Sequence, residues 1–121
     1  TMFIEIGTTE KEWNDVNLCD SVAQIIVNTM KKKQKSHPTA ICFGGTHYSE
    51  KFTNELIHGV CSIGTVVPKY AFEQIDEELF SHVIERNKDA TVALLDWSGM
   101  GKNKQKILGM IEGTDLEVIK L

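Results

Sequence analysis

The segment Thr39-Ala-Ile-Cys-Phe-Gly-Gly-Thr-His-Tyr48 joins a short apolar run to a glycine turn, and the other elements can be placed around it. The apolar run lies between Pro38 and the two glycines, which is typical of a strand buried inside a sheet. Paired glycines allow a tight turn and a close approach of the backbone to a ligand. The segment therefore predicts a central strand that turns directly into a helix.

Helical and strand patterns alternate on both sides of this segment. Thr9 and Glu12 fit a capping box, which predicts a helical turn around Trp13. Four further helices are expected. The first runs from Val16 to the lysines before His37, and the second contains Phe52, Leu56 and Ile57 and ends at Gly59. The third begins near Asp76, and the fourth contains Ile107, Leu108 and Ile111. Strands are expected at residues 2–6, 39–43, 60–67, 91–95 and 116–119, and Pro68 ends the third of them.

The order of these elements predicts the fold class. Strands that alternate with helices form parallel sheets, because each helix carries the chain back to the edge where the previous strand began. We therefore expect an α/β fold, a three-layer α/β/α sandwich with a largely parallel, or mixed, five-stranded sheet, formed by a single domain over residues 1–121. In such sheets ligands bind beyond the carboxyl ends of the strands, where the glycine turn would lie.

The composition is that of an ordinary globular domain, with 41% apolar and 25% charged residues. No apolar run approaches the roughly 20 residues that a membrane span requires, and the first residues do not resemble a secretion signal. Cys19, Cys42 and Cys61 are odd in number and contain no CxxC pair, which favours free thiols in a reducing compartment. We therefore expect a cytoplasmic protein that does not contact a membrane.

The formal net charge of −4 argues against a protein that covers nucleic acid through its overall charge. Two groups of lysines are nevertheless present, one within residues 31–35 and one formed by Lys102, Lys104 and Lys106. Such patches could bind a phosphate backbone locally. The alternative is that they are solvated helix ends, where lysine side chains complement the helix dipole.

The glycine turn is the first candidate site. Amides of Gly44 and Gly45 that point toward the start of a helix would form a cradle for a phosphate or an oxyanion. His47 and the hydroxyl groups of Thr46 and Tyr48 follow at once, and they could transfer a proton or bind a ligand. The alternative is that the glycines only permit a tight turn.

Two further candidates follow the ends of other predicted strands. Lys69 comes after Pro68 and could hold a phosphate or a carbonyl group, or could simply be solvated. Asp96 follows the apolar run 91–95 and could orient His47 or Lys69, or could only cap a turn. Both residues would lie at the same edge of the sheet as the glycine turn.

The remaining histidines, His37, His58 and His82, are expected to be exposed or to have a structural role, because a lone histidine has no required partner. No pair of histidines has the spacing of zinc ligands. The residues by themselves therefore leave the identity of any metal ligands unknown.

Four ordered motifs resemble those of the archaeal and plant-type D-aminoacyl-tRNA deacylases. They are Phe3-Ile-Glu-Ile-Gly-Thr-Thr-Glu-Lys-Glu-Trp13, Phe43-Gly-Gly-Thr-His-Tyr48 with Lys51-Phe52-Thr53, Ile63-Gly64 with Pro68-Lys69-Tyr70-Ala71, and Leu94-Leu-Asp-Trp-Ser-Gly99. The resemblance extends over essentially the whole chain, and it corresponds to the C-terminal part of that family, whose members carry a preceding region with a His-His-Gly segment. It implies a fold related to that of the peptidyl-tRNA hydrolases.

The resemblance implies hydrolysis of the ester bond of D-aminoacyl-tRNA, which releases a D-amino acid and free tRNA in translation quality control. The implied partner is tRNA that carries a D-amino acid, and the chain is also expected as a possible homodimer. Zinc is implied as a cofactor by the resemblance alone. The expected catalytic residues are His47, Lys69 and Asp96, and the expected substrate-binding residues are Gly44, Gly45, Thr46, Tyr48 and Tyr70. His47, directly or through a bound metal, would activate a water, amides near Gly45 and Thr46 would stabilise the oxyanion, and Lys69 would hold the terminal nucleotide.

Two positions depart from the pattern of that family. Thr65 stands where the family often has a histidine, and Thr46 stands where it often has a glycine before His47. Thr65 removes one candidate ligand or base. Two other functions stay open: a non-catalytic tRNA-binding or dimerisation module that lacks the N-terminal half, and a hydrolase of simple D-amino-acid esters.

Overall fold

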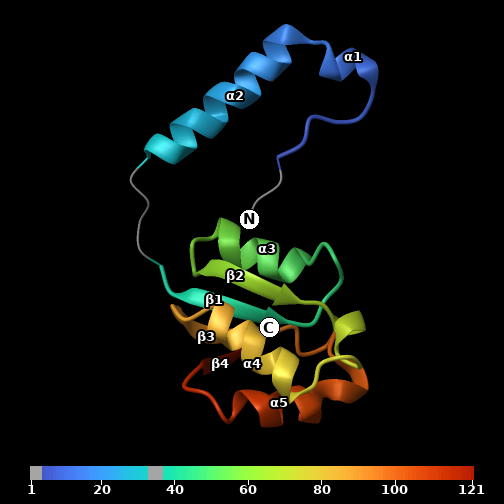
Figure 1. The fold of residues 1–121 in the computed structure, drawn as a ribbon, viewed down its shortest axis with the longest axis vertical. Coiled ribbons are helices and arrows are strands. Elements are labelled where there is room, and N and C mark those ends of the chain that lie inside the picture. Colours follow the sequence, from blue (N-terminus) through green and yellow to red (C-terminus); the bar gives the residue numbers. More distant parts are fainter. Residues whose placement is uncertain (1–3, 33–36) are drawn as a thin grey trace. The chain divides into compact units, whose positions relative to one another are not determined.

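The computed structural model describes residues 4–32 and 37–121. They belong to two compact units, Thr1–Lys35 and Ser36–Leu121, and all strands of the described chain lie in the second unit (Figure 1). That residues 1–121 act as one domain stays a prediction. Within the described residues, no helix is both long enough and apolar enough to cross a membrane.

The first unit contains a short helix, α1 (Glu10–Trp13), whose start is the predicted capping box. The Thr9 hydroxyl accepts a hydrogen bond from the Lys11 amide (3.3 Å), and Glu12 Oε2 accepts one from the Thr9 amide (3.0 Å). Such a box satisfies amides that the first helical turn leaves free, and it thereby fixes where the helix starts. The capping-box prediction is confirmed.

The strand expected at residues 2–6 is not found in the described part of the chain. Residues 4–7 form no strand, and residues 1–3 lie outside the described residues. The alternation of apolar and polar residues suits a strand, but a strand also needs a neighbour that takes up its backbone groups. Here the carbonyl of Ile6 accepts a hydrogen bond from Trp13 Nε1 (2.7 Å) instead.

The longer helix α2 (Val16–Lys31) follows, and Asp15 caps it by accepting a hydrogen bond from the Leu18 amide (3.1 Å). The helix that the apolar spacing predicts is therefore confirmed. No side chain of α2 is buried in the described structure. Of the predicted lysine patch at residues 31–35, residues 33–35 lie outside the described residues.

The second unit is built on a four-stranded sheet. Its strands are β1 (Thr39–Phe43), β2 (Ser62–Val67), β3 (Ala90–Leu95) and β4 (Glu117–Lys120). Neighbouring strands pair in the order β2-β1-β3-β4, and every pair is parallel. The predicted α/β class with a parallel sheet is confirmed, with four strands where five were expected.

The connections between these strands are helical, as crossovers between parallel strands usually are. They are α3 (Glu50–Ile57) between β1 and β2, α4 (Glu77–Arg86) between β2 and β3, and α5 (Lys104–Ile111) between β3 and β4. Two short 3₁₀ helices, η1 (Lys69–Ala71) and η2 (Gly101–Asn103), precede α4 and α5. Figure 1 shows α3 on one face of the sheet and α4 and α5 on the other.

Alternation along the central strands explains the two layers of helices. Phe43 of β1 faces one way and belongs to the same core cluster as Phe80 of α4 and Ile107 of α5. Cys42 faces the other way and packs in a second cluster with Phe52 of α3. Because both faces of β1 are covered, its residues from 40 to 43 are fully buried, as the unbroken apolar run predicts.

The strand order reverses direction beside β1. The chain passes from β1 through α3 to β2 on one side, and then through α4 to β3 on the other side of β1. In α/β sheets a ligand-binding crevice forms at this reversal, beyond the carboxyl ends of the two strands. The Gly44-Gly45 turn follows β1 there, and Asp96 follows β3.

Candidate functional site

The turn after β1 is tied to the ends of both neighbouring strands. Gly44 and Gly45 adopt φ angles of 110° and 71°, which residues with a side chain rarely adopt. The Gly44 amide donates to the last carbonyl of β2 (2.9 Å), and the Lys69 amide donates to the carbonyl of Gly45 (3.2 Å). The Asp96 amide donates to the last carbonyl of β1 (3.0 Å). These bonds fix the turn, Lys69 and Asp96 relative to one another.

Glycines also make room for the side chain of Asp96. A Cβ atom on Gly44 would lie 3.1 Å from Asp96 Cβ, and one on Gly99 would collide with the Asp96 carboxylate itself. A Cβ atom on Gly45 would lie 2.8 Å from Ser49 Oγ. Gly44 and Gly99 are therefore required by the packing around one acid, and not only by the conformation of a turn.

Asp96 is paired with Lys51, which belongs to the first turn of α3. Lys51 Nζ donates to Asp96 Oδ1 (2.6 Å), to Ser98 Oγ (2.9 Å) and to the carbonyl of Leu121 (3.1 Å). The hydroxyl of Ser98 and the amide of Gly99 also donate to Oδ1, each at 3.1 Å. One ammonium group thus joins α3 to the residues that follow β3 and β4.

The Asp96 carboxylate keeps its charge although only 12% of its side chain is exposed. Burial acts to raise its pKa, but the hydrogen bonds from Lys51, Gly99 and Ser98 outweigh burial and hold the pKa below its ordinary value. All these bonds go to Oδ1, and no buried side-chain oxygen of the described residues lacks a partner. Oδ2 accepts no hydrogen bond from the described residues.

The stability of the fold should depend on pH through Asp96. A carboxyl whose pKa is lower in the folded than in the unfolded state stabilises the fold fully above the unfolded pKa of about 3.9, and this contribution is lost as the pH falls through the folded value. Asp96→Asn should therefore lower the free energy of unfolding at about pH 7 and have a smaller effect at about pH 3. Urea titrations of both proteins measure this, and an equal difference at the two pH values would contradict it.

A hollow of about 300 Å³, which we call the turn hollow, opens where these groups meet. It is lined by Gly45, Thr46, Tyr48, Ser49, Glu50, Lys51, Lys69, Asp96 and Gly99. Lys69 and Asp96, which follow separate strands, thus share one hollow with the glycine turn. The amides of Gly45 and Thr46 donate no hydrogen bond to another described residue.

His47 does not line the turn hollow. Its ring lies edge-on to the ring of Tyr48, with 4.8 Å between the centroids. It lines a second hollow of about 180 Å³, the His47 hollow, together with Tyr48, Ser49, Phe52, Thr53, Leu56, Ile63 and Val66. The two hollows adjoin, because Tyr48 and Ser49 line both. The structure therefore brings two of the three expected catalytic residues together and places the third in an adjoining hollow.

The remaining expected substrate-binding residues have different surroundings. Gly44 is buried behind Asp96 and does not line the turn hollow. Tyr48 is 88% exposed at the rim of both hollows, whereas Tyr70 is 63% exposed and lines neither. The hydroxyl of Thr46 donates to the carbonyl of Tyr48 (3.0 Å), so that Thr46 also shapes the turn. Substrate binding by these residues stays a prediction.

Lys51 is the residue to which the sequence alone assigns no role. The expected contact of Asp96 with His47 or Lys69 is absent from the described residues. Lys51 and two near neighbours of Asp96 donate to its Oδ1 atom instead. One signal was present in the sequence: Lys51 is the second residue of α3, where a cation opposes the helix dipole. The unfavourable interaction of Lys51 with the helix dipole suggests a nearby anion that compensates for it, and the structure shows this anion to be Asp96.

The described residues, 4–32 and 37–121, supply no set of zinc ligands. No group of three or more His, Cys, Asp or Glu side chains lies close enough to hold a metal ion in the part of the chain that the structure describes. Burial, with a smaller contribution from Cys61, raises the pKa of the Cys42 thiol to about 12, so that it is not a thiolate near neutral pH. Thr65, which stands where the family often has a histidine, donates a hydrogen bond from its hydroxyl group to Asn87 (3.1 Å). The zinc that the resemblance implies therefore has no ligand set among the described residues.

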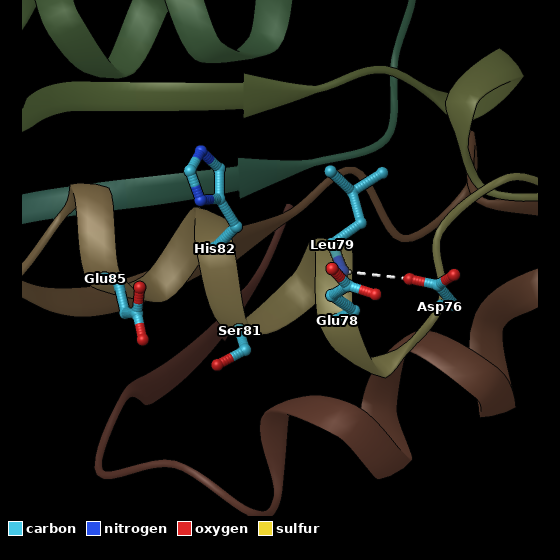
Figure 2. A pocket seen from close by; sticks show the side chains of 6 residues that line it. All are labelled: Asp76, Glu78, Leu79, Ser81, His82 and Glu85. Atoms are coloured by element: carbon cyan, nitrogen blue, oxygen red, sulfur yellow. Dashed lines mark hydrogen bonds between the residues drawn. The ribbon is translucent and has the colours of Figure 1, made fainter.

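A larger hollow, of about 570 Å³, lies along α4 (Figure 2). It is lined by the exposed residues Asp76, Glu78, Leu79, Ser81, His82 and Glu85. All of them belong to one helix and its cap, in which Asp76 Oδ1 accepts a hydrogen bond from the Leu79 amide (2.9 Å). Three carboxylates repel a phosphate, and His82 is exposed, as expected. This hollow is a solvated helix face and is not our candidate site.

A family model described as D-aminoacyl-tRNA deacylase matches residues 1–119. The chain is 49% identical over 119 residues to a D-aminoacyl-tRNA deacylase of Cenarchaeum symbiosum, with 98% of this chain and 46% of that protein covered. It is 34% identical over 122 residues to a D-aminoacyl-tRNA deacylase of Methanocaldococcus jannaschii, with 97% of this chain and 47% of that protein covered. The chain spans about half the length of these curated relatives.

The fold is also similar to one solved by crystallography. The crystal structure of a conserved protein of unknown function matches with a TM-score of 0.74 and 24% sequence identity. The match covers 94% of this chain and 40% of that chain. At this level of identity the similarity supports the arrangement of strands and helices alone.

Proposed function

Since the chain belongs to the D-aminoacyl-tRNA deacylase family, we propose that it forms part of the site at which the ester bond of a D-aminoacyl-tRNA is hydrolysed. The products are free tRNA and a D-amino acid. The observation that carries the proposal is the turn hollow, because Gly45 and Thr46 of the glycine turn line it together with Lys69 and Asp96. An aminoacyl ester offers a matching set: a carbonyl that becomes an oxyanion, a nearby phosphate and an α-ammonium group.

Asp96 is suited to hold the α-ammonium group of the substrate. Its Oδ2 atom belongs to an ionised carboxylate and can accept a hydrogen bond, and bonds between two ionised groups are among the stronger ones. A carboxylate whose pKa is lowered is a weak general base near neutral pH. We therefore assign Asp96 to substrate binding in the reaction rather than to proton transfer.

The amides of Gly45 and Thr46 would hold the oxyanion. When water adds to the ester carbonyl, negative charge develops on the carbonyl oxygen, and amides that already point at this position stabilise it. The intermediate then expels the ribose oxygen, which takes up a proton and restores the free end of the tRNA. Lys69 lines the same hollow and would hold a phosphate of the terminal nucleotide.

His47 is the proposed group for proton transfer. An imidazole titrates near neutral pH, so that it can take a proton from the attacking water and return it to the ribose oxygen. His47 belongs to the same turn as the proposed oxyanion amides, and its hollow adjoins theirs at Tyr48 and Ser49. Phe52 and other apolar residues line the His47 hollow, which suits the side chain of an apolar amino acid.

Replacing His47 by alanine tests this assignment. In the whole protein, His47→Ala should lower the rate of D-aminoacyl-tRNA hydrolysis by about 10²–10⁴-fold, which is the usual contribution of general acid–base catalysis. Affinity for deacylated tRNA should change little, because the imidazole acts on the ester. The rate is measured as the release of radiolabelled D-amino acid from the tRNA.

His82→Ala is the matched control, because it removes an exposed histidine on α4 and should leave the rate unchanged. A His47→Ala protein that hydrolyses the ester at the normal rate would refute the role of His47. A wild-type protein that binds tRNA without hydrolysing the ester would favour the non-catalytic tRNA-binding module. Hydrolysis of simple D-amino-acid esters in the absence of tRNA would favour the small-molecule hydrolase.

A further inference from the structure

Two lysines converge on one tryptophan beside the turn hollow. The ammonium of Lys104 lies 4.6 Å from the centroid of the Trp97 ring, and that of Lys120 lies 4.2 Å from the same ring. Lys104 is the first residue of α5 and Lys120 is the last residue of β4, so that the fold brings them together. Among the described residues, no carboxylate lies within salt-bridge distance of either ammonium. We call Trp97, Lys104 and Lys120 the lysine–tryptophan cluster.

The stability of the fold does not explain this cluster. Two like charges near one ring repel each other, and a cation in the first turn of α5 opposes the helix dipole. A cation–π contact at an exposed site offsets only a small part of such effects. Two ammonium groups without a carboxylate partner are, in contrast, suited to binding anions such as the phosphates of a nucleic-acid strand.

The cluster lies next to the proposed ester site. Trp97 directly follows Asp96, and the Trp97 amide donates to the carbonyl of Leu121 (3.2 Å). The same carbonyl accepts a hydrogen bond from Lys51 (3.1 Å), and both Lys51 and Asp96 line the turn hollow. Trp97 also packs against the main core cluster, which holds its ring in place. Asp96 and the Leu121 carbonyl thus connect the cluster to the turn hollow, which makes the cluster a candidate contact for the phosphates that precede the aminoacylated end.

We propose that Lys104 and Lys120, positioned by Trp97, bind phosphates of the tRNA strand close to its aminoacylated end. The inference rests on the proposed function, because it takes tRNA as the substrate. The proposal assigns a role to Lys104 that it does not assign to Lys102 and Lys106, the other two lysines of that predicted patch. Lys102 is paired with Glu73 (2.8 Å), and Lys106 donates to a backbone carbonyl of the chain (3.0 Å), so that neither is assigned to phosphate binding.

The salt dependence of tRNA binding tests the proposal. Each contact with a phosphate contributes about 0.7–0.9 to the slope of the logarithm of affinity against the logarithm of salt concentration. In the whole protein, Lys104→Gln with Lys120→Gln should make this slope shallower by roughly 1.4–1.8. Lys104→Arg with Lys120→Arg keeps both charges and should keep the slope. Fluorescence anisotropy with deacylated tRNA at several salt concentrations gives the values.

Lys88→Gln with Lys102→Gln is the matched control, because it removes two charges that lie outside the cluster, one exposed before β3 and one paired with Glu73. Its slope should equal that of the wild type. The proposal is overturned by equal slopes in the wild type and the Lys104→Gln, Lys120→Gln variant, and also by an equally large change in the control, which would report overall charge alone.

The ester assay separates a failure of this proposal from a failure of the proposed function. If the wild-type protein does not hydrolyse D-aminoacyl-tRNA, the proposed function is contradicted whatever the slopes are. If the wild-type protein is active and the slopes of all variants are equal, only phosphate binding by the lysine–tryptophan cluster is contradicted.

Discussion

Replacing Gly45 by alanine should lower the rate of D-aminoacyl-tRNA hydrolysis by roughly 10²–10³-fold, which is the usual effect of removing an oxyanion donor. Gly45 has a φ angle of 71°, and an added Cβ atom would lie 2.8 Å from Ser49 Oγ. Rotation of the Ser49 hydroxyl would leave the added Cβ atom 3.0 Å from Ser49 Cβ, so we expect the turn to shift and to displace the amides of Gly45 and Thr46. The rate is measured with the whole protein, and circular dichroism verifies that the variant is folded.

Gly59→Ala is the control for backbone strain. Gly59 has a φ angle of 70°, and the only described atom near an added Cβ is His37 Cε1 at 3.7 Å. Both alanines would meet the same unfavourable backbone conformation, with a cost of about 1 kcal/mol. We expect both variants to lose stability, Gly45→Ala somewhat more because of its contact with Ser49, and only Gly45→Ala to lose activity. An equal loss of activity in both variants would assign the effect to strain and contradict the role of the turn amides.

Lys51→Met should lower the free energy of unfolding by about 2–3 kcal/mol. The substitution removes the donor of three hydrogen bonds and leaves the Asp96 carboxylate, which is 12% exposed, without its cation. Removing one partner of a buried ion pair costs about 3–5 kcal/mol, and we expect less here because 40% of the Lys51 side chain is exposed. Urea denaturation monitored by circular dichroism gives the value.

The exposed pair of Lys102 and Glu73 provides the control. Its two charged atoms lie 2.8 Å apart, much as those of Lys51 and Asp96 do at 2.6 Å, but 80% and 66% of the side chains are exposed. Lys102→Met should therefore have a far smaller effect, because solvent screens exposed pairs. Lys51→Met combined with Asp96→Asn should recover part of the loss, since it leaves no unpaired charge. Equal effects of the two methionine variants would contradict the importance of burial.

The central part of the fold could be predicted because its patterns are local. The apolar run of β1 and the two glycines after it lie within a few residues of one another, and they correctly indicate a buried strand and a turn with positive φ angles. The strand expected at residues 2–6 shows the limit of such patterns. Alternation indicates that a segment could pair with a neighbour, but it does not show that a neighbour is present.

The candidate site could be predicted only where the fold class itself brings residues together. Lys69 and Asp96 follow parallel strands, and the carboxyl ends of such strands meet at one edge of the sheet. The contact of Lys51 with Asp96 joins residues 45 positions apart, and no local pattern shows which distant carboxylate a lysine will meet. The same reason applies to Lys104 and Lys120, which meet only after α5 and β4 have packed.

The packing of Gly44 and Gly99 against Asp96 also limits how such a site can diversify. An added Cβ atom on Gly99 would collide with the Asp96 carboxylate, and one on Gly44 would crowd the Asp96 Cβ atom. Tyr48, in contrast, is 88% exposed and takes no part in this packing. Selection for a different D-amino acid, in nature or in the laboratory, therefore meets a restriction at Gly44 and Gly99 that an exposed residue such as Tyr48 does not have.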